Sequence, residues 1–466
     1  MTDLRARLER YLFDPVDIAW LAAFRALFGL TLCVSMLRFV AYGWVDELFV
    51  KPRFHFKYWG LGWVQALSSA NMHALFWALA ALALCVAAGF LYRLSLALFT
   101  LGFAYLQAVD VSNYLNHYYL ALLLALLLLA SPAHRATSLD VWLRIAEPKR
   151  HVARAWLCLM RFQVGVVYTF AGWAKAHSDW LIHAEPLGIW LGGRSDLPFL
   201  GALVSLPHAA LIMSWAGFLF DTSIVWLLSW SPTRAIAYAA VLLFHMLTRL
   251  LFPIGMFPVI MVLGALVFFP PSWPRVFVGR LRASALANGA PLNSPQPSRR
   301  ARSLLVLAVL YCAIQLGLPL RFLIYGGNVR WHEQGMRFSW RVMVREKNGS
   351  VTFVVRQKAT GRTLHVSPRR YLTRIQEREM SGQPDLIWQL AQHVRADFAE
   401  RGFGDVEVRA DAWVSLNGRA KARLIDPDVD LTNERDGLEK ARWILEAPQE
   451  PPPELHAVAR IAALKS

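Results

Sequence analysis

Apolar and polar residues alternate in long blocks over the first part of the chain. Several apolar blocks are nearly free of charge for about 20 residues, which is the length that a helix needs to cross a bilayer. The pattern predicts nine such helices, at residues 16–41, 72–92, 94–110, 113–131, 154–176, 207–230, 234–251, 254–270 and 302–320. The third, fourth and eighth are short, so one of them is a candidate re-entrant segment. We therefore predict that residues 1–320 form a polytopic helical membrane bundle.

The hydrophobic pattern changes at about residue 321, where mixed polar sequence replaces the apolar blocks. Residues 406–416 alternate between apolar and polar side chains, which is the period of a half-buried strand. Strand-like segments also flank Asn348-Gly349, a pair typical of hairpin turns. Residues 384–402 have the period of an amphipathic helix that ends at Gly402. Residues 321–466 are therefore predicted to form a second domain, which is β-rich and of the α+β class.

Composition and charge agree with the membrane class and predict an orientation. Hydrophobic residues make up 56% of the chain, compared with about 45–50% in soluble domains. The formal net charge is +17, but Arg and Lys cluster in the loops, which fits membrane topology better than nucleic-acid binding. If the N-terminus is cytoplasmic, most basic loops fall on the cytoplasmic side. Nine spans then place the C-terminal domain outside the cytoplasm.

These patterns also narrow the class of partners and chemistry. The first apolar stretch is too long for a cleaved signal peptide and lacks a small-residue cleavage site. The four cysteines lie within predicted spans and form no CxxC motif, so the spacing does not favour a metal site or a disulfide framework. We expect a multi-pass integral membrane protein that contacts lipid, binds no nucleic acid and holds no metal.

Polar residues inside the predicted spans are candidate functional residues, because they are costly in a membrane. Arg161, Tyr168 and Lys175 are seven residues apart in the fifth span. A seven-residue step on a helix drifts by only about 20°, so the three form one stripe. Gly165 and Gly172 repeat at the same interval and favour close approach of another helix. The alternative, in which Lys175 extends to the membrane surface and Arg161 binds a carbonyl oxygen, has about equal weight.

Further polar residues are predicted at the same outer side of the bundle as Lys175. Asn116 and His117 open the fourth span, although a lone histidine in a helix is more often a packing residue than a catalyst. His245 lies in the seventh span, and Met256 follows the break that Pro253 introduces before the eighth. Such convergence suits a lipid-soluble ligand with polar groups, for example a quinone. A neutral Lys175 amine could then accept a proton from a hydroquinone hydroxyl.

Two other charged residues occur within predicted spans. Arg25 lies in the first span and Asp221 in the sixth. Opposite charges in a membrane tend to pair with each other. We predict that Arg25 and Asp221 pair and stabilise the bundle.

Seven motifs spread over nearly the whole chain support a family assignment. In order they are DPVDIAWLAAFRALFGL, NHYYL, VYTFAGWAKAHSDW, FHMLTRLLFPIGMFP, PPSWPR, FSWRVMV and DAWVSLNGRAKARLIDPDVDL. With these motifs the chain resembles the vitamin K-dependent gamma-glutamyl carboxylases and their bacterial relatives with an HTTM-type membrane domain. The resemblance implies a bacterial inner-membrane location.

The resemblance also implies an activity and its residues. In the family, a lysine at the position of Lys175 is the base that deprotonates reduced vitamin K. The quinol anion reacts with O₂, and the oxygenated intermediate removes a γ-proton from a protein glutamate. The carbanion takes up CO₂ to give gamma-carboxyglutamate, and the quinone leaves as its epoxide. Asn116 and His117 match the family's Asn-His pair. We expect catalysis by Lys175, His117 and Asn116.

The expected ligands and partners follow from the resemblance. The quinol is reduced vitamin K or a related naphthoquinol, O₂ and CO₂ are co-substrates, and the partner is a glutamate-containing protein or peptide. The residues expected to contact the quinol are Tyr168, His245, Arg161 and Met256.

The chain departs from the family's pattern in three places. It lacks the cysteine pair expected in the animal enzymes, and it is shorter at the C-terminus. The segment RQKATGRTLHVSPRRYL keeps GRT but diverges around the part expected to bind glutamate, where His365, Arg369 and Tyr371 are the candidates. The alternatives to the carboxylase are a quinol epoxidase, or a membrane protein that binds quinone or lipid without carboxylation.

Overall fold

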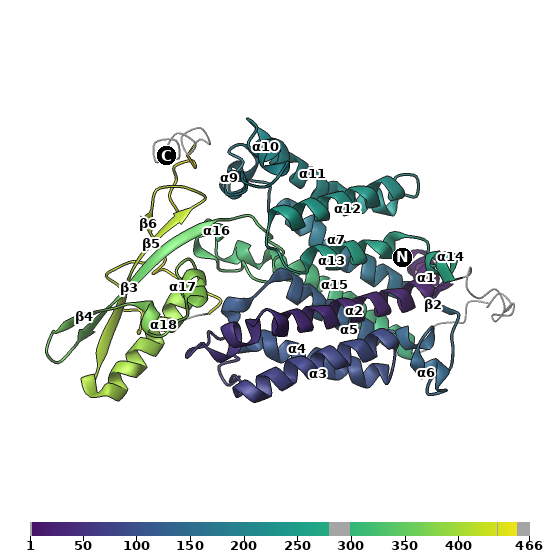
Figure 1. Cartoon of the computed structure of the whole chain (residues 1–466), viewed down its shortest axis with the longest axis horizontal. Coiled ribbons are helices and arrows are strands. Elements are labelled where there is room, and N and C mark those ends of the chain that lie inside the picture. The colour runs from purple at the N-terminus through teal and green to yellow at the C-terminus, as the bar shows by residue number, and fades with distance from the viewer. Residues whose placement is uncertain (1, 279–298, 436, 454–466) are drawn as a thin grey trace.

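The structure is a computed structural model that describes residues 2–278, 299–435 and 437–453. Helices make up most of it, and a smaller sheet-containing region follows at the C-terminus (Figure 1). The predicted fold class, a helical membrane bundle followed by a β-containing region, is confirmed. We call the end of the bundle that contacts the sheet region the sheet-facing end, and the opposite end, where the N-terminus lies, the far end.

Each predicted span overlaps one helix of the bundle. The helices are α2 (Ala19–Ala41), α3 (Ser69–Ala88), α4 (Tyr92–Val109), α5 (Asn116–Ala130), α7 (Arg154–Trp173), α11 (Ala209–Ser229), α12 (Arg234–Leu251), α13 (Phe257–Ala265) and α15 (Arg299–Leu320). Among the described residues, seven of these are long and apolar enough to cross a membrane, whereas α5 and α13 are shorter. The predicted count of nine spans is therefore not confirmed.

The two short helices have local causes. The α5 helix begins only at Asn116 because Asp110 accepts a hydrogen bond from Ser112 N at 2.9 Å and starts a separate 3-10 turn. The α13 helix begins after Pro253 and Gly255, and Gly255 has a φ of 62° that a helix does not accept. Turn and loop conformations thus replace the first three residues of each predicted span.

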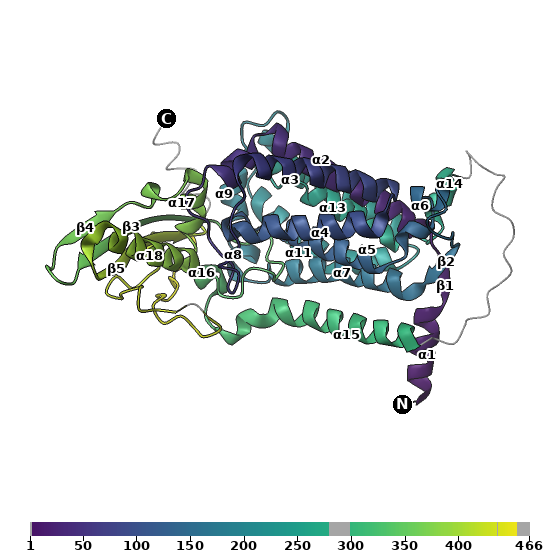
Figure 2. The same cartoon turned by 90° about the horizontal axis from the view of Figure 1, so that it is seen from below.

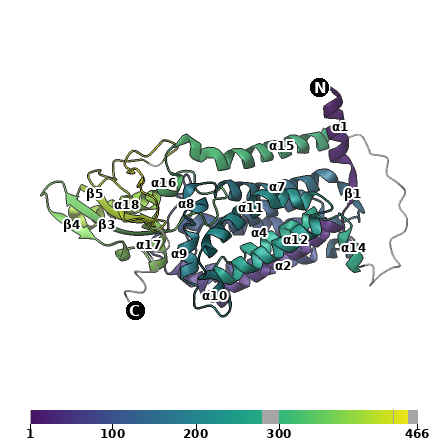
Figure 3. The same cartoon turned by 90° about the horizontal axis from the view of Figure 1, so that it is seen from above.

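Short elements connect the bundle helices. These are α1 (Thr2–Phe13), β1 (Pro15–Asp17), α6 (Leu139–Trp142), β2 (His151–Ala153), α8 (Ser178–Leu181), α9 (Leu187–Gly192), α10 (Leu200–Val204) and α14 (Trp273–Val278). The β1 and β2 strands pair antiparallel at the far end, where Arg275 also forms an ion pair with Asp17 at 2.6 Å. The α15 helix runs along the outside of the bundle beside α7 (Figures 2 and 3).

The C-terminal region is built on a four-stranded antiparallel sheet. Its elements are α16 (Val329–His332), β3 (Lys347–Gln357), β4 (Thr363–Val366), α17 (Arg374–Met380), α18 (Pro384–Phe398), β5 (Val406–Leu416) and β6 (Ala422–Arg423), and the strand order is β4-β3-β5-β6. The alternate residues of β5 are buried, as the sequence predicts. They pack against the apolar face of α18, so the predicted amphipathic helix is also confirmed.

The predicted hairpin at Asn348-Gly349 is wrong. Both residues lie inside β3 and pair with Ser415 and Val414 of β5. A Cβ at Gly349 would come within 2.4 Å of Ser381 O, so the glycine permits a close backbone approach instead of a turn. The observed hairpin joins β3 to β4, and Gly361 supplies its positive φ of 71°.

Loops at the sheet-facing end of the bundle hold the C-terminal region. Gln389 of α18 forms two hydrogen bonds with the backbone of Lys57, at 2.8 and 3.0 Å. Gln376 of α17 donates to Phe54 O at 2.7 Å and to Asp110 Oδ2 at 2.8 Å. The two regions are therefore in fixed contact around the ends of α4 and α5.

Candidate active site

Lys175 lies just beyond the C-terminal end of α7, at the sheet-facing end of the bundle. It is only 6% exposed. Its Nζ donates to Asp221 Oδ2 of α11 at 2.6 Å and to Ala171 O at 3.1 Å, and it lies 5.4 Å from the centre of the Trp180 ring. The side chain therefore does not extend to the surface but forms a buried ion pair.

The predicted pair between Arg25 and Asp221 is wrong. Arg25 lies at the far end, where it donates to Val86 O, Ala87 O and Thr137 O at 2.8, 2.7 and 2.6 Å. Two of these oxygens belong to the last turn of α3, where helix carbonyls lack intrahelical partners and attract a cation. Backbone oxygens thus satisfy Arg25, which leaves Asp221 to Lys175.

A cavity of about 90 Å³ lies against Lys175. Its wall is largely apolar and comes from α7, α11, α12, α13, the segments between them, and Val342 and Met343 of the C-terminal region. The Tyr168 hydroxyl and His245 Nε2 lie 3.0 Å apart in this wall. His245 Nδ1 is buried and has no hydrogen-bond partner among the described residues. The lining residues include Tyr168, Lys175, Trp180, Trp190, Asp221, Phe244, His245, Ile254, Phe257, Val342 and Met343.

A second, larger cavity of about 470 Å³ adjoins the first. The two share Ile254, Phe257, Val342 and Met343 in their linings. Asn116 and His117 of α5 line the second cavity together with aromatic side chains of α2, α3 and α4. The Tyr114 hydroxyl donates to Asn116 Oδ1 at 2.9 Å.

His117 contributes a second nitrogen without a partner. Its side chain is buried, and Nε2 forms no hydrogen bond within the part of the chain that the structure describes. A Cβ at Gly255 would lie 3.5 Å from this atom. Buried polar atoms are normally paired, and these two histidine nitrogens are the buried ones in the two cavity walls that are available to hydrogen-bond a ligand, among the residues described.

Met256 and Arg161, the two other residues predicted to contact the quinol, are not in the lining of the cavity that contains Lys175. Met256 packs against the bundle core between two cavity residues, Gly255 and Phe257, but is not among the cavity residues described above. Arg161 lies toward the far end of α7, where it donates to Val267 O at 2.8 Å and Phe268 O at 3.2 Å. Of the predicted stripe, only Tyr168 and Lys175 share a cavity, and Arg161 binds carbonyl oxygens as in the alternative interpretation.

The three predicted glutamate-binding residues lie at the edge of the C-terminal sheet. His365 is exposed on the edge strand β4. Arg369 forms an ion pair with Glu377 at 2.8 Å, and the Tyr371 hydroxyl donates to Asp397 at 2.6 Å. The structure does not bring them to either cavity as lined above, so their binding role stays a prediction.

Several cavity residues were not predicted from the sequence. Asp221 was assigned to the wrong partner, and Trp180 was not singled out although it follows Lys175 by five residues. Val342 and Met343 belong to the FSWRVMV motif of the C-terminal region and line both cavities. The motif supports the family assignment, but its residues follow neither a helix nor a strand period. The sequence therefore does not predict where Val342 and Met343 lie.

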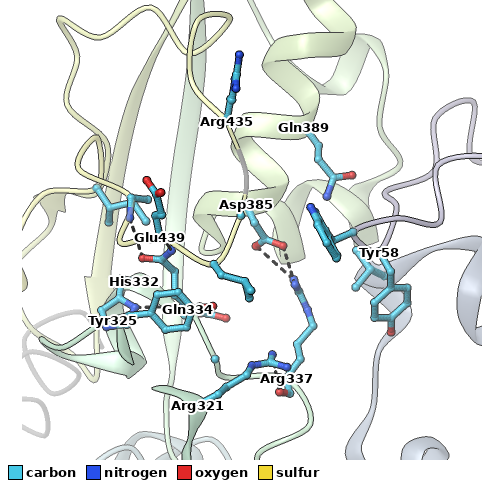
Figure 4. A pocket seen from close by; sticks show the side chains of 18 of the residues that line it. Tyr58, Arg321, Tyr325, His332, Gln334, Arg337, Asp385, Gln389, Arg435 and Glu439 are labelled. Carbon is cyan, nitrogen blue, oxygen red and sulfur yellow. Dashed lines mark hydrogen bonds and ion pairs between the residues drawn. The ribbon is translucent and has the colours of Figure 1, made fainter. Parts of the chain in front are cut away.

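A third cavity, of about 280 Å³, lies between the bundle loops and the C-terminal region (Figure 4). Arg337 donates to the two oxygens of Asp385 at 2.6 and 3.3 Å, and Arg321 donates to Arg337 O at 3.0 Å. Gln389 of α18 and Tyr58 of a bundle loop also line this space. The charges of Arg337 and Asp385 neutralise each other. We therefore interpret this cavity as part of the contact between the bundle and the C-terminal region.

Comparison with known families agrees with this architecture. The model of the HTTM domain matches residues 13–273, more than half of the chain. The model of the vitamin K-dependent gamma-carboxylase, lumenal domain, matches residues 300–450. The class is thus a multi-pass membrane protein of the HTTM type. The chain belongs to the vitamin K-dependent gamma-glutamyl carboxylase family. No solved structure matches the chain.

Proposed function

We propose that this protein carboxylates glutamate side chains of a protein or peptide to gamma-carboxyglutamate, coupled to epoxidation of a naphthoquinol such as reduced vitamin K. The balanced reaction converts quinol, O₂, CO₂ and glutamate into quinone epoxide, gamma-carboxyglutamate and water. The observation that carries the proposal is the buried Lys175–Asp221 pair, which faces an apolar cavity next to His245 and His117. The family supports a carboxylase-type activity.

The cavity residues fit a quinol. Ligand sites of this kind are mostly apolar with a few polar groups that fix orientation. His245 Nδ1 and His117 Nε2 are the polar atoms that lack partners among the described residues, and they would hold quinol hydroxyls. The aromatic wall of the larger cavity would hold an apolar tail. Oxidation of the bound quinol by O₂ supplies the strong base that glutamate deprotonation requires.

Lys175 and Asp221 would act together as the proton acceptor. A buried carboxylate favours the charged form of a neighbouring amine, whereas burial alone favours the neutral form. The pair can accept a proton in the state in which the Lys175 amine is neutral and Asp221 is ionised. The amine then takes a proton from the quinol. The Asp221 carboxylate at 2.6 Å then stabilises the ammonium group that forms. The Trp180 ring beside Nζ provides further stabilisation of the cation.

A quinol epoxidase without carboxylation is the second candidate. The observation in its favour is the position of His365, Arg369 and Tyr371 at the sheet edge, away from the cavity that contains Lys175. In this case the quinol chemistry is retained but no glutamate is presented. The same cavities without turnover would correspond to a quinone- or lipid-binding protein.

The test measures both products of the purified protein in lipid nanodiscs. The protein receives several naphthoquinols, O₂, hydrogencarbonate and a Glu-rich peptide, with the matched Gln peptide as control. Mass spectrometry quantifies quinone epoxide and peptide carboxylation. We expect both products with the Glu peptide. Epoxide alone would identify a quinol epoxidase, and absence of both products with every quinol would contradict the enzymatic proposal.

We also propose that residues 1–320 form the membrane domain and residues 321–466 an extracytoplasmic domain of a bacterial inner-membrane protein. Seven and nine are both odd, so either span count puts the two chain ends on opposite sides of the membrane. The distribution of basic loops favours a cytoplasmic N-terminus. A reporter that is active only in the cytoplasm, fused after Ser466, should be silent. A strong signal from it would contradict the orientation.

A further inference from the structure

Tyr114 lies in the segment that leads into α5, and the backbone around it fixes its position. The 3-10 turn Val111–Asn113 ends at Tyr114, whose backbone N–H donates to Val111 O at 3.1 Å. The side chain of Asp110 caps the start of that turn. The Tyr114 ring packs edge-on against Phe338 of the C-terminal region, with the ring centres 5.1 Å apart. Tyr114 therefore lies where the bundle meets the C-terminal region, and it lines the larger cavity.

Two hydrogen bonds connect the Tyr114 hydroxyl to the C-terminal region and to α5. The Phe338 backbone N–H donates to the hydroxyl oxygen at 2.8 Å. The hydroxyl in turn donates to Asn116 Oδ1 at 2.9 Å. Asn116 is the first residue of α5 and lines the larger cavity together with His117. A chain of hydrogen bonds thus runs from the C-terminal region to a residue of the candidate site.

The backbone at Phe338 adopts an unusual conformation that allows this contact. Its φ is 62°, which residues other than glycine rarely adopt. The Phe338 ring packs against Tyr119, with the ring centres 4.9 Å apart, and the Arg321 guanidinium lies 5.7 Å from its centre. Such strain persists where the surrounding packing holds it, often at functional sites. Packing therefore directs the Phe338 N–H toward the Tyr114 hydroxyl, although the local sequence does not favour that conformation.

The direction of the two hydrogen bonds determines how the Asn116 amide is turned. A backbone N–H can only donate, so the Tyr114 oxygen accepts from Phe338 and its single proton is left for Asn116. The atom of Asn116 that faces Tyr114 must then be the acceptor, Oδ1. The opposite orientation would direct two donors at the hydroxyl oxygen and leave the hydroxyl proton without this acceptor. The network therefore favours one orientation of the amide.

The other end of the amide, Nδ2, remains for a ligand. Asn116 is half-buried, unlike the two histidines of the cavity walls, and its Nδ2 makes no hydrogen bond within the described part of the chain. Nδ2 carries two N–H groups and no lone pair that accepts. The group that it can bind in the larger cavity is therefore an oxygen that accepts a hydrogen bond.

We propose that Tyr114 is a positioning residue, which holds Asn116 so that its amide N–H groups bind an oxygen of the naphthoquinone ring. This inference rests on the proposed function, in which the ligand is a naphthoquinol. The ring oxygen is a carbonyl in the quinone, and it shares the negative charge of the quinolate that remains after a proton has left. A donor that is already oriented stabilises such an oxygen without reorganisation. The Phe338 N–H makes the C-terminal region part of this arrangement.

The first test measures the carbonyl stretch of menadione, a naphthoquinone without a tail, bound to the full-length protein in nanodiscs. Isotope labelling of its carbonyl carbons separates its infrared bands from those of the protein. A hydrogen bond weakens the carbonyl bond, so we expect a lower wavenumber than for free menadione in the same lipid. In Tyr114→Phe and Asn116→Ala the band should move part of the way back. A wild-type band at the free position, or no movement in Tyr114→Phe, contradicts the inference.

The second test measures quinol epoxidation in a double-mutant cycle. Tyr114→Phe should lower kcat about 2- to 10-fold, which corresponds to the loss of one hydrogen bond. If Tyr114 acts through Asn116, the same change should have no further effect in an Asn116→Ala background. A tyrosine with only a structural role would lower kcat by the same factor in both backgrounds, and that result would contradict the inference.

Tyr105→Phe is the matched control. Tyr105 of α4 also donates its hydroxyl to an oxygen, Gln65 O at 2.8 Å, but it is not among the described lining residues of either cavity. Its menadione band and kcat should equal those of the wild type. If Tyr114→Phe does not fold, 4-methoxyphenylalanine in place of Tyr114 provides the test. Its oxygen can still accept from Phe338 N–H but can no longer donate to Asn116.

The outcomes separate this inference from the proposed function. A wild type that forms neither epoxide nor carboxylated peptide, but binds menadione with a band shift that depends on Tyr114, contradicts the proposed function and supports the positioning role. A wild type that forms both products, with an unchanged band and kcat in a folded Tyr114→Phe variant, contradicts only the positioning role. Absence of saturable menadione binding to the wild type also contradicts the inference.

Discussion

Each end of the bundle contains a buried cation, Arg25 at the far end and Lys175 at the sheet-facing end, and the two have different partners. At the far end, Arg25 donates to three backbone oxygens, and a Cβ at Gly89 would come within 2.5 Å of its Nη1. At the sheet-facing end, Lys175 has one carboxylate partner and borders a cavity that also contains His245, whose Nδ1 has no hydrogen-bond partner among the described residues. A charge in a membrane helix is therefore not by itself a sign of a site. Space beside it and neighbours without partners distinguish a functional charge from a structural one.

The largest expected effect is on turnover, and it distinguishes Lys175, just beyond one end of α7, from Arg161 toward the other end. Lys175→Arg keeps the positive charge, but arginine stays protonated in proteins, so it cannot accept the quinol proton. We expect turnover to fall by about 10²- to 10⁴-fold, the usual contribution of a general base, while quinone binding persists. Arg161→Lys, at the other end of the same helix, should leave turnover close to that of the wild type. Epoxide formation in nanodiscs measures both.

Full turnover in Lys175→Arg would contradict the assignment of the base. A complementary result is expected from Lys175→Ala, in which a small exogenous amine should restore part of the activity by filling the vacated space. If no small amine restores activity while quinone still binds, the turnover of Lys175→Arg decides whether Lys175 is the base.

The next effect concerns stability and tests the pairing of the charges. Lys175→Met leaves Asp221 buried without its partner, which should lower the free energy of unfolding by about 3–5 kcal/mol. Adding Asp221→Leu removes the unpaired charge and should restore most of that loss. The same second change should not rescue Arg25→Met, because Arg25 binds backbone oxygens. Rescue of Arg25→Met by Asp221→Leu would show that the two ends are paired after all.

A smaller effect, dependent on pH, comes from Glu185 in the loop beside the Lys175 cavity. Burial raises its pKa to about 7, although the Ile189 N–H donates to it, and Asp179 adds to the rise. The folded state then holds the proton more tightly than the unfolded state, so stability falls as pH rises from about 4.5 to 7. Glu185→Gln should be more stable than the wild type at pH 8, by up to about 3 kcal/mol.

The same variant should differ little from the wild type near pH 4.5, where both forms of residue 185 are neutral. Thermal unfolding followed by tryptophan fluorescence at both pH values measures the difference. Glu400→Gln changes an exposed glutamate and should give no pH-dependent difference. Equal stability of Glu185→Gln and the wild type at pH 8 would contradict the raised pKa.

The smallest effect compares two glycines of α7. A Cβ at Gly172 would come within 2.6 Å of Thr222 Cγ2 and 3.1 Å of Thr222 N, next to Asp221. At Gly165 the nearest atom is Val225 Cγ1 at 3.5 Å, an ordinary contact. Gly172→Ala should therefore cost about 1–3 kcal/mol by overpacking, whereas Gly165→Ala should be nearly neutral. Equal costs in thermal unfolding would contradict the close approach of α7 and α11 at Gly172.

The sequence predicts the helices of the bundle well, because each lies in a long apolar block and such blocks are visible from composition alone. It predicts helix ends poorly at α5 and α13, where Asp110 and Gly255 fix loop conformations. The hairpin at Asn348-Gly349 failed for a related reason. A turn-forming pair is only a local preference, and the pairing of β3 with β5 along eleven residues overrides it.

The candidate site could be predicted only in part. Lys175, Tyr168, His117 and His245 stand out because polar residues in apolar blocks are costly, and the family motifs include all of them. The partner of Lys175 could not be predicted, since the sequence contains no information on which of two cations lies beside Asp221. The contributions of the FSWRVMV segment depend on backbone conformations such as the positive φ of Met343, 52°, which have no periodic signature.

The position of the bound quinone decides whether the active site lies at the sheet-facing end of the bundle. A photoreactive naphthoquinone is bound to the protein in nanodiscs, crosslinked by light and mapped by mass spectrometry. We expect labels in peptides that contain Tyr168 to Trp180 and Ile254 to Met261, suppressed by excess unlabelled quinone. We expect no displaceable label in peptides that contain Arg25 or Gly89. Displaceable labelling at the far end, with none around Lys175, would contradict the claim that the sheet-facing end is the active site.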